Sequence, residues 1–433
     1  MKKSALLWLA LMGCLPGFAQ LHRDTAERRL REYFTALTAL RQFNGNVLIA
    51  DSNEVLLRAS FNLAPGRDSL SVQPDSRFII ASVSKVFVKY AILLLEEEGR
   101  LRRSDKLARY IPDFPKGNRI SIGHLMEHRS GLPRELAGHE RFDSPSLRQV
   151  ARLAAKEQLL FAPGTQTHYS NIGFSLLHYI IDRAAPGGYA AYIQRMLRRL
   201  GLPATGEYNG SKKVPHFAWG FDNQQGTITA TPPKSIGRFE TGNYYSTIDD
   251  LYAFSCQLPK GGLVRESRAR SLFAGDSLLV QAGGRSGYRA YFYKNLNTGV
   301  TILFTCNYTD IPIQEMTADL VNLLAGKPYS VPAPIDRKEI ALPDSILNRY
   351  TGVYVLEADE KQALTFTASD GALWVQDSAG SKERLKADSD TSFFEDPHSK
   401  DGYYYTWNAT TSTYELTIVS TGIRLKTKKT GAK

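Results

Sequence analysis

The sequence has little cysteine and, after its first residues, no long apolar run. Only Cys14, Cys256 and Cys306 occur among 433 residues, and their spacing is not that of a metal site. We expect Cys256 and Cys306 to be two buried thiols rather than a disulfide. No later segment reaches the roughly 18 unbroken apolar residues that a membrane-spanning helix needs. The sequence therefore predicts neither a cysteine-held metal nor an integral membrane protein.

The sequence also lacks the motif spacings of nucleic-acid-binding modules. It carries 54 Lys and Arg against 43 Asp and Glu, a formal net charge of +11. The basic residues are scattered in short clusters along the chain, without a continuous basic stripe. The charge therefore indicates a solvated surface, or attraction to an anionic cell envelope, and no nucleic-acid partner.

Residues 1–19 have the pattern of a secretion signal. Lys2 and Lys3 give a positive start, an apolar stretch follows at 5–12, and small residues stand at 17–19. Cys14 offers an alternative, as the lipidated residue of a lipoprotein. We expect an exported protein, periplasmic or extracellular, with membrane association only through a lipidated Cys14.

The rest of the chain is too long for one compact core and divides into two domains. Residues 20–326 open with a strand hairpin, continue with helices and end in three strands. This order predicts an α+β domain whose two ends meet in one antiparallel sheet. Residues 327–343 are a proline-rich linker, and 344–433 carry six short strands separated by glycine turns. The tail is therefore expected to be a small all-β barrel or sandwich.

Helical periodicity places the remaining elements of the first domain. We expect helices at 24–41, 82–98, 105–114, 121–128, 144–160, 171–181, 189–200, 247–258 and 309–324, with 204–245 mostly loop.

Ser82 and Lys85 stand where the most apolar of these helices begins. Residues three apart share one face of a helix, so the hydroxyl and the amine can meet. A helix N-terminus also offers free backbone N–H groups that stabilise an oxyanion. Alone, this Ser-x-x-Lys spacing is weak evidence, and a helix-capping serine with a snorkelling lysine explains it better.

Two further blocks occur with the Ser-Val-Ser-Lys at 82–85. They are Pro-Gly-Thr-x-x-x-Tyr-Ser-Asn at 163–171 and Gln-Ala-Gly-Gly-Arg-Ser-Gly-Tyr at 281–288. The stretches 120–133 and 170–177 support them. In order and spacing these blocks resemble the serine β-lactamase and penicillin-binding-protein family, in particular class C β-lactamases, D-alanyl-D-alanine carboxypeptidases and related esterases. The resemblance covers about residues 25 to 325, and the tail resembles the β-domain often appended to such hydrolases.

The resemblance implies a β-lactamase-like fold and assigns roles within it. Ser82 is implied as the nucleophile, Lys85 and Tyr169 as the proton-transfer groups, and Asn171 as the residue that holds Lys85 and the substrate amide. The third block, including Gly283, lines the substrate site, and the Ser82 and Gly284 N–H groups form the oxyanion hole. Whether the amine or the phenol acts as base stays open.

The third block departs from the family pattern at Gln281, where the family usually has lysine or histidine. That cation helps to bind a substrate carboxylate and tunes the tyrosine. Arg285, four residues later, is our hypothesis for a substitute; the alternative is a solvated loop arginine. The departure also raises the alternative of a weakly active or inactive envelope protein that binds peptidoglycan fragments.

A third alternative is a zinc peptidase, because His124, Glu127 and His128 match a His-x-x-Glu-His motif. No Gly-x-Ser-x-Gly elbow exists, which excludes the α/β-hydrolase mechanism. The main prediction is an exported serine hydrolase that forms an acyl-enzyme on Ser82. It needs no cofactor and acts on a small molecule or a peptidoglycan peptide, with a β-lactam, D-amino-acid peptide or ester bond as its target.

Overall fold

The computed structural model describes residues 23–63, 71–137, 146–210, 213–224, 227–231, 242–357, 359–378, 380–420 and 423–430. The predicted leader at 1–19, with Cys14, lies outside the described residues. None of the helices described combines the length and the apolar character that crossing a bilayer requires.

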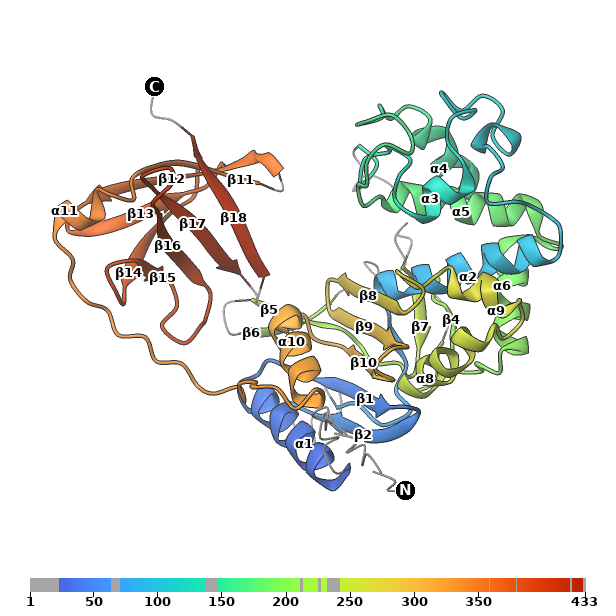
Figure 1. Cartoon of the computed structure of the whole chain (residues 1–433), viewed down its shortest axis with the longest axis horizontal. Coiled ribbons are helices and arrows are strands. Elements are labelled where there is room, and N and C mark those ends of the chain that lie inside the picture. The colour runs from blue at the N-terminus through green and yellow to red at the C-terminus, as the bar shows by residue number, and fades with distance from the viewer. Residues whose placement is uncertain are drawn as a thin grey trace, which may run out of the picture.

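A five-stranded antiparallel sheet joins the two ends of the first domain (Figure 1). The strands β1 and β10 pair within this sheet, although their paired residues lie more than 250 positions apart in the chain. The α+β fold class predicted from the order of elements is therefore confirmed. The strand order is β2 (Glu54–Phe61), β1 (Gly45–Asp51), β10 (Thr301–Cys306), β9 (Tyr288–Asn295) and β8 (Leu278–Arg285).

Each face of this sheet packs against its own helices because side chains alternate along a strand. In β1, Val47 and Ile49 join the core under α1 (Arg23–Ala39) and α10 (Ile313–Leu324). Leu48 and Ala50 point to the other face, into the larger core around α2 (Ser84–Glu97). This alternation buries both faces of the sheet and leaves β8 at its edge.

The helical half of the domain is built around α2, whose apolar residues are buried on all sides. The other helices there are α3 (Ile122–Met126), α4 (Leu147–Ala154), α5 (Asn171–Ala184), α6 (Gly188–Arg199), α8 (Ile248–Gln257) and α9 (Glu266–Arg270). A small sheet of β3 (Phe78–Ile79), β7 (Tyr244–Ser246) and β4 (Gly206–Glu207) leads into α2, and β5 (Phe221–Gln224) pairs with β6 (Thr227–Ala230).

One of the sequence expectations for this region is wrong, and two others are refined by the structure. The helix expected at 105–114 is only a single 3-10 turn, η2 (Leu107–Arg109). The Leu107 N–H donates to the Ile120 carbonyl and the Ala108 N–H to that of Gly117, so loop contacts satisfy backbone groups that a helix would use. Residues 204–245, expected to be mostly loop, contain the short strands β4 to β7. The helix expected at 144–160 is also shorter, since α4 ends at Ala154.

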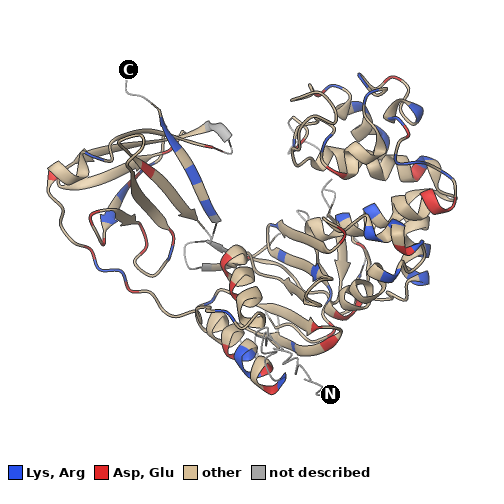
Figure 2. Ribbon diagram, in the orientation of Figure 1, with Lys and Arg blue, Asp and Glu red and all other residues tan. Residues whose placement is uncertain are grey.

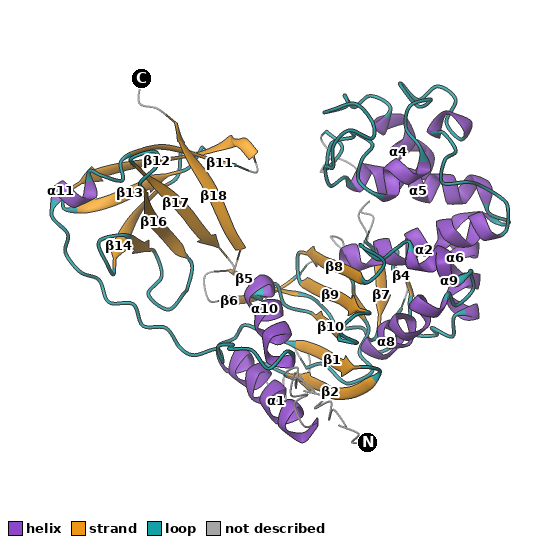
Figure 3. Cartoon of the chain, in the orientation of Figure 1, coloured by secondary structure: helices purple, strands orange, loops and turns teal. Residues whose placement is uncertain are grey.

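The tail is a closed eight-stranded barrel, so the all-β expectation is confirmed (Figure 3). Its strands are β11 (Gly352–Leu356), β12 (Asp359–Ser369), β13 (Ala372–Gln376), β14 (Lys382–Ala387), β15 (Ser392–Phe394), β16 (Gly402–Asn408), β17 (Thr413–Ser420) and β18 (Ile423–Thr430), preceded by α11 (Asp344–Leu347). Aromatic rings fill the interior, with Tyr350 stacked on Tyr405 at 4.2 Å. Several Lys and Arg residues lie along the strand β18 (Figure 2).

The linker and the barrel are fixed to their neighbours by charged groups. Arg337 of the linker pairs with Asp388 of the barrel at 2.6 Å and is almost fully buried. Lys400 of the barrel pairs with Glu315 of α10. Cys306 is a buried thiol, as expected, whereas Cys256 is a free thiol that is only partly buried.

Candidate active site

Ser82 lies in a 3-10 turn, η1 (Ala81–Val83), that leads directly into α2. Ala81 has φ 44°, a left-handed conformation that costs a non-glycine residue roughly 1–2 kcal/mol. The neighbouring backbone fixes this strained turn: the Ile80 N–H donates to the Tyr244 carbonyl, and Gly242 packs against Ala81. Strain of this kind is common where a reactive side chain must be presented.

Lys85 lies one helical turn after Ser82, as the spacing predicted. Its Nζ is 2.9 Å from Ser82 Oγ, and the residue is only 1% exposed. Two aromatic rings lie beside the amine, with the centroid of Tyr169 at 5.0 Å and that of Phe174 at 5.4 Å. Both rings come from α5 or from the loop before it, so the packing of α2 against α5 holds the lysine under the serine.

Tyr169 completes the contact from the opposite side. Its OH donates to Ser82 Oγ at 2.8 Å. The following residue, Ser170, is the N-cap of α5 and accepts a hydrogen bond from the Gly173 N–H. Burial raises the pKa of Tyr169, and the Ser82 hydrogen bond and the nearby Arg134 offset this only in part. The phenol is therefore held neutral and oriented toward the serine.

His128 packs against Tyr169, ring on ring, with centroids 4.3 Å apart. Its Nδ1 accepts a hydrogen bond from the Ser170 N–H, which leaves the proton of a neutral ring on Nε2. Burial first, and then the positive charges of Lys89 and Lys85, lower the pKa of His128 to about 3. This histidine is therefore a neutral platform for the phenol.

The zinc alternative is not supported by this geometry. The helix α3 ends at Met126, and His128 has φ 58°, so the two histidines do not share a helix face. His124 instead completes the capping box of Ser121. Within the described ranges, no group of three His, Cys, Asp or Glu residues could hold a metal ion.

Asn171 is the first residue of α5 and follows Tyr169 by two positions. Its Nδ2 donates to the carboxylate of Glu135, whereas its buried Oδ1 has no hydrogen-bond partner among the described residues. A carboxylate accepts only, so the Glu135 contact fixes which end of the amide points where. The orphaned oxygen is an acceptor that a substrate group or a movement of Lys85 would satisfy.

The edge strand β8 forms the other wall. A Cβ added to Gly283 would lie 3.2 Å from the Ser82 backbone nitrogen, so this glycine lets β8 approach the serine closely. Gln281 donates its Nε2 to the Ala282 carbonyl at 2.9 Å, and Arg285 donates to Asn243 Oδ1 at 3.0 Å. A Cβ added to Gly284 would point toward the Arg289 side chain, at 3.6 Å from its Cδ.

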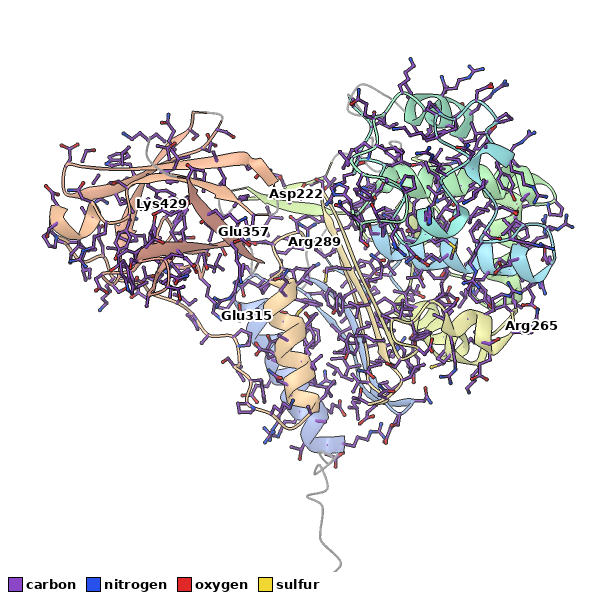
Figure 4. All side chains as sticks on the ribbon, turned by 45° about the horizontal axis from the view of Figure 1, so that its top comes forward. Asp222, Arg265, Arg289, Glu315, Glu357 and Lys429 are labelled. Atoms are coloured by element: carbon purple, nitrogen blue, oxygen red, sulfur yellow. The ribbon has the colours of Figure 1, made fainter. Side chains whose placement is uncertain are left out.

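Asp222 of β5 fixes the turn between β8 and β9. Its carboxylate accepts hydrogen bonds from Ser286, from the Gly287 N–H at 2.9 Å and from Thr309 at 2.9 Å. Burial alone would raise the pKa of Asp222, but these donors lower it overall. Figure 4 shows Asp222 and Arg289 where β5 meets the sheet. Asp222 therefore anchors the turn at the end of β8, the strand that approaches Ser82.

Of the residues predicted from the sequence, Lys85 and Tyr169 are each hydrogen-bonded to Ser82 Oγ. Gly283 and Asn171 flank them. The sequence interpretation gave no role to Arg134, Glu135 or Asp222. The signal for the first two was their position directly after the Ser-Gly-Leu-Pro of the 120–133 block, whereas nothing local marks Asp222.

Comparison with known proteins decides the family. The β-lactamase family model matches residues 30–293, more than half of the chain. The chain belongs to the β-lactamase family. The predicted resemblance is therefore confirmed, and the family and its hydrolase members support a serine hydrolase of the penicillin-binding-protein type.

Relatives extend the match over both domains. The chain is 26% identical over 418 residues to penicillin-binding protein 4* of Bacillus subtilis, covering 86% of this chain and 92% of that protein. The octameric penicillin-binding protein homologue from Pyrococcus abyssi has 18% identity and a TM-score of 0.62, covering 94% and 99%. The D-amino acid amidase from Ochrobactrum anthropi, solved with D-phenylalanine, has 18% identity and a TM-score of 0.59, covering 70% and 99%.

Proposed function

We propose that this protein hydrolyses an amide, ester or β-lactam bond through an acyl-enzyme on Ser82. The observation that carries the proposal is the hydroxyl of Ser82 between two proton-transfer groups, Lys85 Nζ at 2.9 Å and Tyr169 OH at 2.8 Å. A serine hydroxyl needs such a partner to attack a carbonyl. The Oγ also lies at the N-terminal end of α2, where the helix dipole favours the negative charge that develops.

The proposed proton path uses both groups that contact Ser82 Oγ. Burial raises the pKa of Tyr169, which disfavours a phenolate. In the proposed first step, Lys85 Nζ in its unprotonated form takes the Ser82 proton as Oγ bonds to the carbonyl carbon. Tyr169 then gives its proton to the leaving nitrogen or oxygen, and Lys85 returns the proton that Tyr169 lost. Water attacks the ester in the same way and frees Ser82.

The proposed oxyanion hole uses the Ser82 N–H and a backbone N–H of β8 at Gly283 or Gly284. Support for this comes from Gly283, whose Cα approaches the Ser82 and Val83 nitrogens without an intervening side chain. Removal of one such donor typically costs about 3 kcal/mol of transition-state stabilisation. The chemistry proposed needs no cofactor.

We propose export and a small-molecule or peptidoglycan-peptide substrate as part of the same function. Export rests on the leader pattern of residues 1–19. The choice of substrate is supported by relatives named as a penicillin-binding protein and as a D-amino acid amidase. A membrane contact of this protein would go through a lipidated Cys14.

A second candidate is a peptidoglycan-binding protein without turnover. The observation that favours it is Gln281, a neutral residue whose amide donates to the neighbouring Ala282 carbonyl. Such a site would bind ligands without acylating Ser82.

Labelling of the serine distinguishes the two candidates. A fluorophosphonate and a fluorescent penicillin should each add one adduct mass to the intact protein, and Ser82→Ala should abolish both. Tyr169→Phe should slow labelling by about 10²–10³-fold with little change in melting temperature, because it removes only the proton donor. If the native protein melts cooperatively and neither probe reacts, the hydrolase proposal is wrong and the binding protein is favoured.

A further inference from the structure

The site lacks a cation where the third block would carry one, and the structure identifies which other cation faces it. Gln281 is neutral, and Arg285 donates to Asn243 at the end of β8. Lys89 lies one turn deeper along α2, with Nζ 5.9 Å from the Phe174 centroid and mostly buried. A substitute cation should lie beside the groups that contact Ser82 and be open to solvent, whereas Arg285 and Lys89 are both partly buried.

Arg134 meets both conditions. Its guanidinium carbon is 5.3 Å from the ring centroid of Tyr169, the residue whose OH contacts the nucleophile. The side chain is 67% exposed, so the cation faces solvent. Two hydrogen bonds fix the backbone beneath it: the Arg134 carbonyl accepts from the Asn171 N–H at 2.8 Å, and the Pro133 carbonyl accepts from Ser170 Oγ at 2.7 Å.

Glu135 does not neutralise this guanidinium. The ion pair between the two neighbours is 3.8 Å long, with both side chains exposed, and such pairs are weak in water. The Glu135 carboxylate is also engaged by Asn171 Nδ2. The planar fork of Arg134 therefore stays available for a second carboxylate, which it can bind through two parallel hydrogen bonds.

The position of Arg134 defines which part of a substrate it would contact. β8, with Gly283, forms one wall of the site, and the 130–137 loop with the N-terminus of α5 forms the other. Arg134 and Glu135 both contact Asn171, the residue that the family resemblance assigns to the substrate amide. A carboxylate bound by Arg134 would therefore lie against the 130–137 loop, opposite β8.

We propose that Arg134 selects substrates whose acyl portion carries a carboxylate. This specificity rests on the proposed acyl-enzyme function of Ser82. A carboxylate bound there would neutralise a cation that otherwise stands beside Tyr169, and would hold the acyl chain along the 130–137 loop while Ser82 attacks its carbonyl.

The test compares two penicillins that differ only in the acyl side chain. In carbenicillin, a carboxylate replaces one hydrogen of the CH₂ group that joins the phenyl ring to the amide carbonyl in benzylpenicillin. The measurement is the second-order rate at which each penicillin protects Ser82 from a fluorophosphonate. The native protein should prefer carbenicillin. Arg134→Ala should lower the carbenicillin-to-benzylpenicillin ratio about 10-fold or more, as for the loss of a charged hydrogen-bond pair, and Arg134→Lys should retain part of it.

Matched variants make the result specific. Arg148→Ala removes an exposed arginine of α4 and should leave the ratio unchanged. If Arg285→Ala lowers the ratio and Arg134→Ala does not, or if the native protein shows no preference or no protection, the assignment of Arg134 is overturned. Fluorophosphonate labelling without any penicillin tests the underlying function separately: its absence refutes the hydrolase, whatever Arg134 does.

Discussion

The close approach of Gly283 to the Ser82 turn makes a sharp test of the site geometry. A methyl group added at position 283 would lie 2.3 Å from the Ile80 carbonyl oxygen and 3.2 Å from the backbone nitrogens of Ser82 and Val83. Ordinary van der Waals contact begins at 3.4 Å. All three neighbours are backbone atoms, which cannot rotate away. Gly283→Ala must therefore separate β8 from the turn by about 1 Å.

This displacement should cost far more activity than stability. A misplacement of about 1 Å near a reacting centre lowers rates about 10²-fold, and loss of an oxyanion donor lowers them about 10²–10³-fold. Overpacking of this kind destabilises a fold by about 1–3 kcal/mol. We therefore expect Gly283→Ala to label with fluorophosphonate about 10²–10³-fold more slowly than the native protein, while it still melts cooperatively.

The neighbouring glycine provides the control. A methyl group at Gly284 would meet nothing closer than Arg289 Cδ at 3.6 Å, an ordinary contact with a flexible side chain. Gly284→Ala should therefore label within a few-fold of the native rate. The assay is the second-order rate of adduct formation followed by intact mass, with a thermal melt of each variant. Equal damage from both substitutions, or a Gly283→Ala rate close to native, would refute the geometry.

Two further predictions concern pH and stability. Burial lowers the pKa of His128 and of His178 to about 3, whereas an unfolded chain protonates histidine near 6.5. Below that pH the unfolded state binds the extra protons, so the unfolding free energy should fall by up to about 1.4 kcal/mol per pH unit per histidine. Melts from pH 7 to 5 should show this slope, and His178→Leu should reduce it; an unchanged slope contradicts it. Asp222, whose pKa is lowered, stabilises the fold fully above about pH 4, so Asp222→Ala should lower the melting temperature at pH 7, and the difference from native should shrink as the pH falls below 4. It should also slow labelling of Ser82, because Gly287 loses its anchor; native kinetics would contradict that role.

The strands and long helices of the first domain were predictable because their cores have regular periods. The helix expected at 247–258 is α8, which begins after Thr247, whose side chain accepts from the Asp250 N–H as an N-cap. The strands β14 and β15 were not predicted. β14 reads Lys-Glu-Arg-Leu-Lys-Ala and carries only one large apolar residue, so its place in the barrel comes from its neighbours rather than from its own pattern.

The hydrogen-bonded trio of Ser82, Lys85 and Tyr169 was predictable from short-range spacing for only one of its pairs. Helical geometry alone brings Lys85 to Ser82, three residues away. Tyr169 is 87 residues further along the chain, and only the family resemblance connected it with the serine. His128 was noticed for the wrong reason: its spacing to His124 fits a metal pair on a helix, but the helix ends between them. A short sequence motif therefore does not predict a shared helix face where the helix ends inside the motif.

Two arginines are candidates for the cation that Gln281 does not supply. Arg285 is the candidate from the sequence, because it follows Gln281 within the same block. On the edge strand β8 it lies two residues, about 7 Å, beyond Gly283, and it donates a hydrogen bond to Asn243. Arg134 belongs to a loop that the backbone of Asn171 ties to the start of α5, and so it lies beside Tyr169 although 35 residues separate them. Selection for charge at one point in space does not require charge at one point in the sequence. A family member can therefore lose the third-block lysine and keep a cation at its site, provided that the substrate carries its carboxylate on the other side of the bond to be cut.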